Sequence, residues 1–145
     1  MTSIICYLDF MSPQASLAFE RLPGLLRGLS YSVRYKPVLL GSGLQQQELL
    51  RLAVACDEAG MPNRYVCGAI FNHVLTCGDE ALSAARLAAL KAQLAPVQDV
   101  AGEHVTRQLT AHTAEAIEMG VAFVPGFVVD GQVVGSLDAL TLLQR

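Results

Sequence analysis

A serine followed by a proline is the first pair of residues that could do chemistry. Ser12 and Pro13 stand before apolar residues at helical spacing, which predicts a helix with Ser12 as N-cap and Pro13 in its first turn. The positive end of a helix stabilises a thiolate, and a serine hydroxyl there could donate a hydrogen bond to it. The alternative interpretation is that Ser12 is only a helix cap, worth about 1 kcal/mol.

A valine and a proline ahead of a predicted hairpin form the second pair. Asp130-Gly131 between two apolar runs predicts antiparallel strands over 127–129 and 132–134, because both turn residues can adopt a positive φ. Proline is tolerated at the start of a strand, so Val124-Pro125 is where we expect a cis-proline loop. The backbone of Val124 could pair with an extended ligand there, or the proline could only shape the hairpin.

The cysteines and histidines suggest little further chemistry. Cys6, Cys56, Cys67 and Cys77 have no CxxC spacing and lie in apolar stretches, so we expect reduced, buried thiols. His73 and Cys77 are four residues apart on one helix face, but structural zinc needs four ligands and, even with Cys67, no fourth is evident. We therefore predict no metal site and interpret these residues as part of a core stripe.

The elements that must hold these residues follow from apolar periodicity. Residues 3–8 are predicted to form a buried strand. Residues 31–38 alternate in type, which predicts a strand whose Ser32, Arg34 and Lys36 face solvent. Helical stripes follow at 49–56, 65–77, 82–90 and 103–117, and a short closing helix is expected at 137–143. The β-α-β opening favours parallel strands with a right-handed crossover.

Length and composition bound the class of protein. The 145 residues predict a single domain, 1–145, with a helical insertion at about 44–100. The net charge of -3 and the sparse Lys and Arg argue against a nucleic-acid partner. No apolar run is long enough for a membrane span and the first residues lack a signal-peptide pattern, so we expect no membrane association and a cytoplasmic location.

Two regions together resemble a known family. They are Leu8-Asp9-Phe10-Met11-Ser12-Pro13 and the stretch from Leu109 to Gly131, especially Val124-Pro125 and Phe127 to Gly131. The sequence is similar to the DsbA-like branch of the thioredoxin superfamily and, more narrowly, resembles 2-hydroxychromene-2-carboxylate isomerases and kappa-class glutathione transferases. The resemblance implies an α/β thioredoxin-like fold, in the order β-α-β, helical insertion, α-β-β-α, with a mixed sheet.

The resemblance also implies a thiol cofactor. Redox members carry a CxxC motif before the first helix, where this chain has Ser12-Pro13-Gln14-Ala15, so dithiol exchange at that motif is ruled out. The glutathione-using members have a serine at this place, which implies that Ser12 stabilises the thiolate of glutathione. Val124 and Pro125 would then bind its cysteinyl part.

The resemblance further suggests contacts and partners. Ser136 and Asp138 resemble residues that hold the γ-glutamyl end of glutathione, although Leu137 separates them and capping of the final helix is the alternative. The implied reaction is isomerisation or transfer on a small-molecule aromatic-pathway substrate. Relatives are often dimers, so a homodimer is expected by the same resemblance.

The chain departs from the family pattern in three places. It largely lacks the longer stretch after Gly41, Phe123 stands where glycine usually precedes the Val-Pro pair, and Gly126 stands where threonine is usual. A bulky Phe123 would fill the space of a ligand. Two other functions therefore stay open: a non-catalytic DsbA-like binding protein, and a thiol-disulfide oxidoreductase acting through one of the four cysteines.

Overall fold

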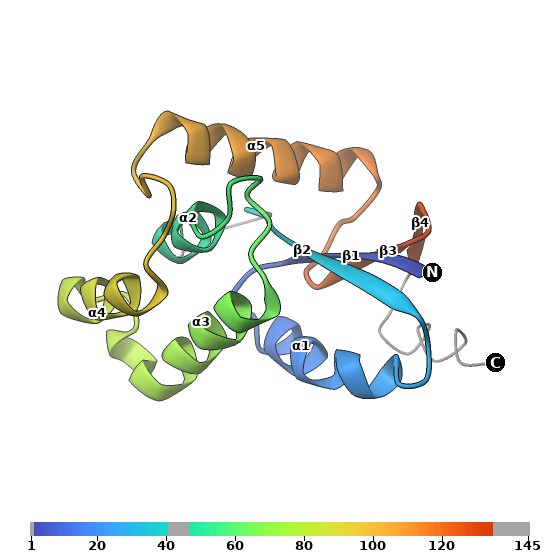
Figure 1. Ribbon diagram of the computed structural model, residues 1–145, viewed down its shortest axis with the longest axis horizontal. Coiled ribbons are helices and arrows are strands. Elements are labelled where there is room, and N and C mark those ends of the chain that lie inside the picture. The colour runs from blue at the N-terminus through green and yellow to red at the C-terminus, as the bar shows by residue number, and fades with distance from the viewer. Residues whose placement is uncertain (1, 41–46, 135–145) are drawn as a thin grey trace.

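The computed structural model describes residues 2–40 and 47–134 (Figure 1). Its elements, in chain order, are β1 (Thr2–Leu8), α1 (Pro13–Leu25), β2 (Tyr31–Pro37), α2 (Gln47–Ala55), α3 (Arg64–Cys77), a 3₁₀ turn (Gly78–Glu80), α4 (Ala84–Leu94), α5 (Glu103–Glu118), β3 (Gly126–Val129) and β4 (Gln132–Val134). These bounds confirm the predicted strands and helices up to Val134. The expected closing helix at 137–143 lies outside the described residues.

The strands form one mixed sheet in the order β2-β1-β3-β4. β1 and β2 are parallel, whereas β3 runs antiparallel to both β1 and β4. Asp130 and Gly131 join β3 to β4 with φ angles of 48° and 86°, the positive values that a tight hairpin turn requires. The β-α-β opening and the mixed sheet are therefore as the sequence predicted.

Helices cover both faces of the sheet (Figure 1). On one face, Ile4, Cys6 and Leu8 of β1 pack in the large core that includes α1 and α3. On the other face, Tyr7 packs with Ala116 of α5 in a smaller cluster. Alternate residues of β1 thus serve two different cores, because side chains alternate across a strand.

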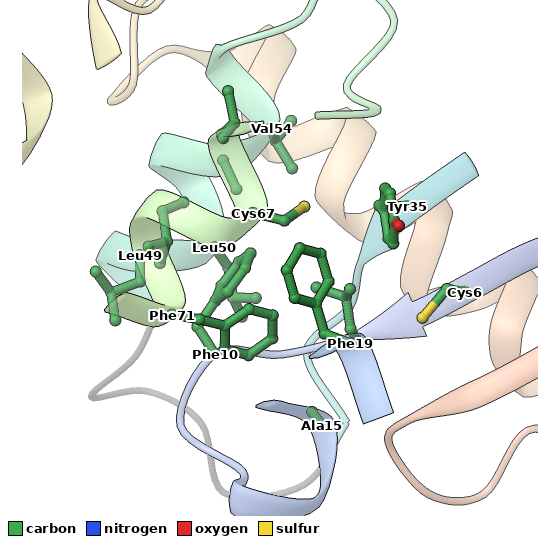
Figure 2. Close-up of a cluster of buried hydrophobic side chains, with 14 of the residues drawn as sticks. Cys6, Phe10, Ala15, Phe19, Tyr35, Leu49, Leu50, Val54, Cys67 and Phe71 are labelled. Atoms are coloured by element: carbon green, nitrogen blue, oxygen red, sulfur yellow. The ribbon is translucent and has the colours of Figure 1, made fainter. Parts of the chain in front are cut away.

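Aromatic rings fill the larger core between α1 and α3 (Figure 2). The ring centroid of Phe71 lies 5.0 Å from that of Phe10 and 5.0 Å from that of Phe19. Arg64 covers the outer side of this group, with its guanidinium carbon 4.0 Å from the Phe19 ring centroid. Such aromatic contacts stabilise a core beyond the area that they bury.

Within residues 2–40 and 47–134, no helix is both long and apolar enough to cross a bilayer. Three of the helices, α1, α3 and α4, begin with a polar cap residue. Asn63 and Ser83 accept hydrogen bonds from the first turns of α3 and α4, as Ser12 does for α1. The cap side chains supply hydrogen-bond acceptors for backbone N–H groups in the first turn, which have no partner within the helix.

Candidate functional site

The two predicted site pairs, Ser12-Pro13 and Val124-Pro125, lie at the same edge of the sheet, where β1 ends. β1 ends at Leu8, and its antiparallel register pairs Tyr7 with Gly126, the first residue of β3. Extending this register by one residue places Pro125 opposite Leu8. The chain then reaches Ser12 after a short turn, so the start of α1 and the loop before β3 belong to the same edge, where open α/β sheets bind ligands.

Ser12 has the local geometry that its sequence predicted. Its side-chain oxygen accepts a hydrogen bond from the backbone N–H of Ala15 at 3.3 Å, and Pro13 is the first residue of α1. The hydroxyl also donates to the exposed Gln14 Oε1 at 3.2 Å. The hydroxyl hydrogen of Ser12 is therefore held only by a surface side chain that a ligand can displace.

A buried aspartate, which the sequence analysis did not select as a site residue, supports the turn before Ser12. Asp9 is only 6% exposed, and its Oδ1 accepts the backbone N–H of Ser12 at 3.1 Å. This hydrogen bond fixes the direction in which the chain enters α1. A polar residue at the end of an apolar strand was the signal that could have indicated such a role.

The second pair, Val124-Pro125, lies just before the β3 ladder. The Val124-Pro125 peptide bond is cis. Val124 lines a hollow of about 600 Å³ together with Leu40, Ile117 and residues 120–123, which we call the loop hollow. Pro125 lines a smaller hollow beside β4. Ser12 lines neither of these two hollows, so the structure puts both pairs at one edge without joining them in one hollow.

Phe123 and Gly126, the residues on either side of the Val124-Pro125 pair, are the two flanking departures from the family pattern. Phe123 is 82% exposed and lines the wall of the loop hollow, so it does not fill the interior. Gly126 is buried, and a Cβ atom there would lie only 2.3 Å from Cγ1 of Val121. Val121 occupies the space that a side chain after the proline would need, which is why glycine stands at this position.

Ser136 and Asp138 lie outside the described residues. The structure therefore shows no position for them relative to Ser12 or Val124. Both stay predicted contacts of a bound ligand.

A polar cluster under α5 was missed by the sequence analysis. Glu115 accepts hydrogen bonds from the Tyr7 hydroxyl and, at 2.7 Å, from Lys36 Nζ. Lys36 was predicted to face solvent together with Ser32 and Arg34, which are exposed, but its side chain is only 13% exposed because α5 covers this end of β2. Neighbouring strand positions carrying a tyrosine and a lysine were the only signal in the sequence.

The cluster shifts the titration of its members. Burial and the hydrogen bond and negative charge of Glu115 all raise the pKa of Tyr7. Burial alone would raise the pKa of Glu115, but the hydrogen bonds from Lys36 and Tyr7 and the charge of Lys36 outweigh it, so that this pKa is lowered. Glu115 is thus held ionised, and the cluster ties α5 to the sheet.

His112 lies on the same helix and is also buried. Its Nε2 lies 2.9 Å from the carbonyl oxygen of Gly60. Burial lowers the pKa of His112, since desolvation disfavours the charged imidazolium. A neutral imidazole that donates Nε2–H to Gly60 fits this environment, which gives His112 a structural role between α5 and the loop before α3.

Three of the four thiols occupy environments that disfavour the thiolate. Cys6 and Cys67 are buried in the larger core (Figure 2). Burial raises the pKa of Cys6 to about 12, although Arg64 opposes the effect, and burial raises the pKa of Cys67 as well. Burial likewise raises the pKa of Cys56 to about 11. These three cysteines are free, and their thiols are poorly suited to attack a disulfide.

Cys77 and His73 form a separate pair near the end of α3. Cys77 Sγ lies 3.7 Å from His73 Nδ1, and His73 Nε2 lies 2.8 Å from the carbonyl oxygen of Ala81. Cys67 does not join this pair, because it faces the core. In the described part of the chain, no three His, Cys, Asp or Glu side chains converge as they would around a metal ion.

The element order and the strand order give this chain a thioredoxin-like α/β fold, with a helical block between β2 and α5 as in DsbA-like structures. No protein-family model matches the sequence, and a search of curated proteins found no match. Solved structures do match over nearly the whole chain.

A proposed protein-disulfide isomerase from Pseudomonas syringae has a TM-score of 0.68 at 18% identity, with 99% of this chain and 93% of that chain covered. Reduced DsbA1 from Neisseria meningitidis has a TM-score of 0.67 at 14% identity, with coverages of 97% and 79%. A 2-hydroxychromene-2-carboxylate isomerase has a TM-score of 0.61 at 17% identity, with coverages of 98% and 92%. These similarities confirm the predicted DsbA-like thioredoxin fold.

Proposed function

We propose that this protein is a glutathione-dependent isomerase or transferase of the 2-hydroxychromene-2-carboxylate isomerase or kappa-class type, in which Ser12 stabilises the glutathione thiolate. The observation that carries the proposal is the hydroxyl of Ser12 at the positive end of α1, on the sheet edge that also holds the cis-proline loop. A structural neighbour of the isomerase type supports it, as does the absence of both cysteines from the Ser12-Pro13-Gln14-Ala15 turn.

The residues at this edge fit a thiolate. The Ser12 hydroxyl would turn its hydrogen from the exposed Gln14 to the sulfur while its oxygen keeps the bond from Ala15 N. The partial positive charge of the α1 N-terminus would add to this stabilisation. When bound, glutathione supplies the nucleophile for addition to a conjugated carbon of the substrate.

Further contacts to glutathione are proposed at the cis-proline loop and beyond β4. The backbone of Val124, which precedes the β3 ladder, would pair with the cysteinyl part of glutathione beside Pro125. Ser136 and Asp138 would contact the γ-glutamyl end. The four free thiols suit a reducing compartment, where glutathione is abundant.

Calorimetric titration tests the proposal. We expect glutathione to bind more tightly than S-methylglutathione, which has no thiol, at a pH where the bound thiol is ionised. Ser12→Ala should abolish this preference while S-methylglutathione binding stays nearly constant. Ser83→Ala is the matched control, because Ser83 makes the same cap hydrogen bond at 3.3 Å at the start of α4. Absence of glutathione binding at millimolar concentration would contradict the proposal and favour a non-catalytic binding protein.

Thiol-disulfide exchange is the second candidate, favoured by the disulfide isomerase and DsbA1 among the structural neighbours. The burial of Cys6 and Cys67 argues against it. It predicts insulin-reductase or disulfide-isomerase activity that a single cysteine substitution removes. Activity in wild type that survives Ser12→Ala but not Cys77→Ser would replace the glutathione proposal by this one.

A further inference from the structure

A hollow between α2 and α5 is lined by Arg51, a cationic side chain that forms no ion pair with another described residue. This α2–α5 hollow has a volume of about 310 Å³, and its lining includes Leu39, Arg51, Leu109, Thr110, Thr113 and Ile117. Ile117 also lines the loop hollow, and Leu39 is the chain neighbour of Leu40, which lines that hollow too. The two hollows therefore have Ile117 in common, and we call the pair of hollows the groove.

Arg51 is held in place by neutral oxygens. Its Nε, Nη1 and Nη2 donate to the Val100 carbonyl at 2.8 Å, the Thr106 hydroxyl at 2.6 Å and the Gly102 carbonyl at 2.9 Å. Among the described residues, the ion pairs are formed by other groups, Lys36 with Glu115 and Arg86 with Glu80. Arg51 thus carries a full positive charge at the wall of the hollow.

The guanidinium also keeps donors for a ligand. An arginine side chain has five N–H donors, and the three bonds to Val100, Thr106 and Gly102 use one on each nitrogen. Hydrogen bonds to described residues thus leave one N–H on each of Nη1 and Nη2. A guanidinium can use two N–H donors to bind the two oxygens of a carboxylate.

The rest of the lining is mainly apolar, although Gln47, Thr106 and Thr110 also line the α2–α5 hollow. Ile117, which lines both hollows, is 61% exposed, while Leu39 lines one hollow and Leu40 the other. The Thr113 hydroxyl donates to Leu109 O and accepts from Leu39 N, so it presents mainly its methyl group to a ligand. An apolar body along Ile117 with a negative end at Arg51 satisfies both parts of the groove.

We propose that the groove binds a small apolar carboxylate, with its carboxylate on Arg51 and its apolar part along Ile117 toward Val124. This binding does not require glutathione, because Arg51 and Ile117 lie on α2 and α5 and not at the Ser12 turn. The alternative is that Arg51 only fastens the segment before α5 to α2. The two roles differ in whether a negative charge on a ligand matters.

The test is a backbone-amide NMR titration of the glutathione-free protein with cinnamate and with its neutral counterpart cinnamamide. We expect cinnamate to shift amides of α2 and α5 and to bind about tenfold more tightly than cinnamamide, the size of effect typical of a charge-assisted hydrogen bond. Equal affinity for the two probes, or no shifts in α2 and α5 at millimolar cinnamate, would overturn the proposal.

Substitutions distinguish an effect of the Arg51 charge on ligand binding from an effect on the fold. Thr110 is exposed and lines the hollow, so Thr110→Glu should remove the preference for cinnamate without disturbing the core. Thr76→Glu, on an exposed position of α3, is the matched control and should leave it intact. Ile117→Ser should weaken the binding of cinnamate and of cinnamamide equally. If Thr110→Glu and Thr76→Glu behave alike, Arg51 has only the structural role.

Discussion

Gly126, the residue after the cis-proline, offers a quantitative test of how this loop is packed. Its ideal Cβ position lies 2.3 Å from Cγ1 and 3.4 Å from Cβ of Val121, and 3.2 Å from the carbonyl oxygen of Phe123. Val121 is only 5% exposed, so it cannot turn into solvent. Gly126→Ala must therefore displace a packed side chain, which typically costs about 1 to 3 kcal/mol.

A double-mutant cycle identifies Val121 as the cause. Val121→Ala removes the clashing methyl group and by itself should cost about 2 kcal/mol of lost burial and cavity formation. The double variant should be about as stable as Val121→Ala alone, because the new Cβ then fills vacated space. The coupling energy is therefore expected to be about 1 to 3 kcal/mol in favour of the pair.

Urea denaturation followed by circular dichroism measures these differences. Gly24→Ala is the control, since a Cβ at Gly24 meets no atom within 4 Å and lies in α1, where alanine is favoured by about 0.5 to 1 kcal/mol. The reasoning fails if Gly126→Ala is as stable as wild type, or if its cost is unchanged in the Val121→Ala background.

Three further predictions concern the cap, the polar cluster and the thiols. Ser12→Ala should reduce the free energy of unfolding by about 1 kcal/mol, measured in urea, because α1 loses its cap hydrogen bond; an unchanged midpoint would contradict it. Because folding lowers the pKa of Glu115, its carboxylate stabilises the folded protein above the unfolded pKa of 4.5. This stabilisation is lost as the pH falls through the folded pKa. Glu115→Gln removes the ion pair with Lys36 and should therefore cost about 0.5 to 1 kcal/mol at neutral pH. The variant should also lose less stability than wild type as the pH falls, and an equal loss in both proteins would refute this. Iodoacetamide followed by mass spectrometry should label the partly exposed Cys77 at least about a hundredfold faster than Cys6, which becomes accessible only when the core opens; comparable rates would show that the core is not closed.

Local chemistry explains why so much of the fold could be predicted. Ser12-Pro13 specifies a helix start and Asp130-Gly131 a tight turn through the preferences of those residues alone. The apolar run of β1, the alternation along β2 and the helical stripes likewise involve only near neighbours. Few topologies are compatible with this order of elements, and the thioredoxin-like fold is one of them.

The candidate site was predicted in part for the same reason. Ser12 and Val124-Pro125 could be selected because each belongs to a short local pattern. Their common location required only the strand register that brings Gly126 opposite Tyr7. Asp9 and Val121 were not selected, since their roles depend on which atoms face them.

Interactions between distant parts of the chain were decided by the tertiary structure. Glu115 bonds to Lys36 and Tyr7 across sequence separations of 79 and 108 residues, and α5 buries Lys36 that alternation alone would leave in solvent. Arg51 binds the segment before α5 and the first turn of α5, 49 to 55 residues away. No local sequence pattern predicts such pairs. Their interaction energy arises only when packing brings the charged and polar groups together and removes the water around them.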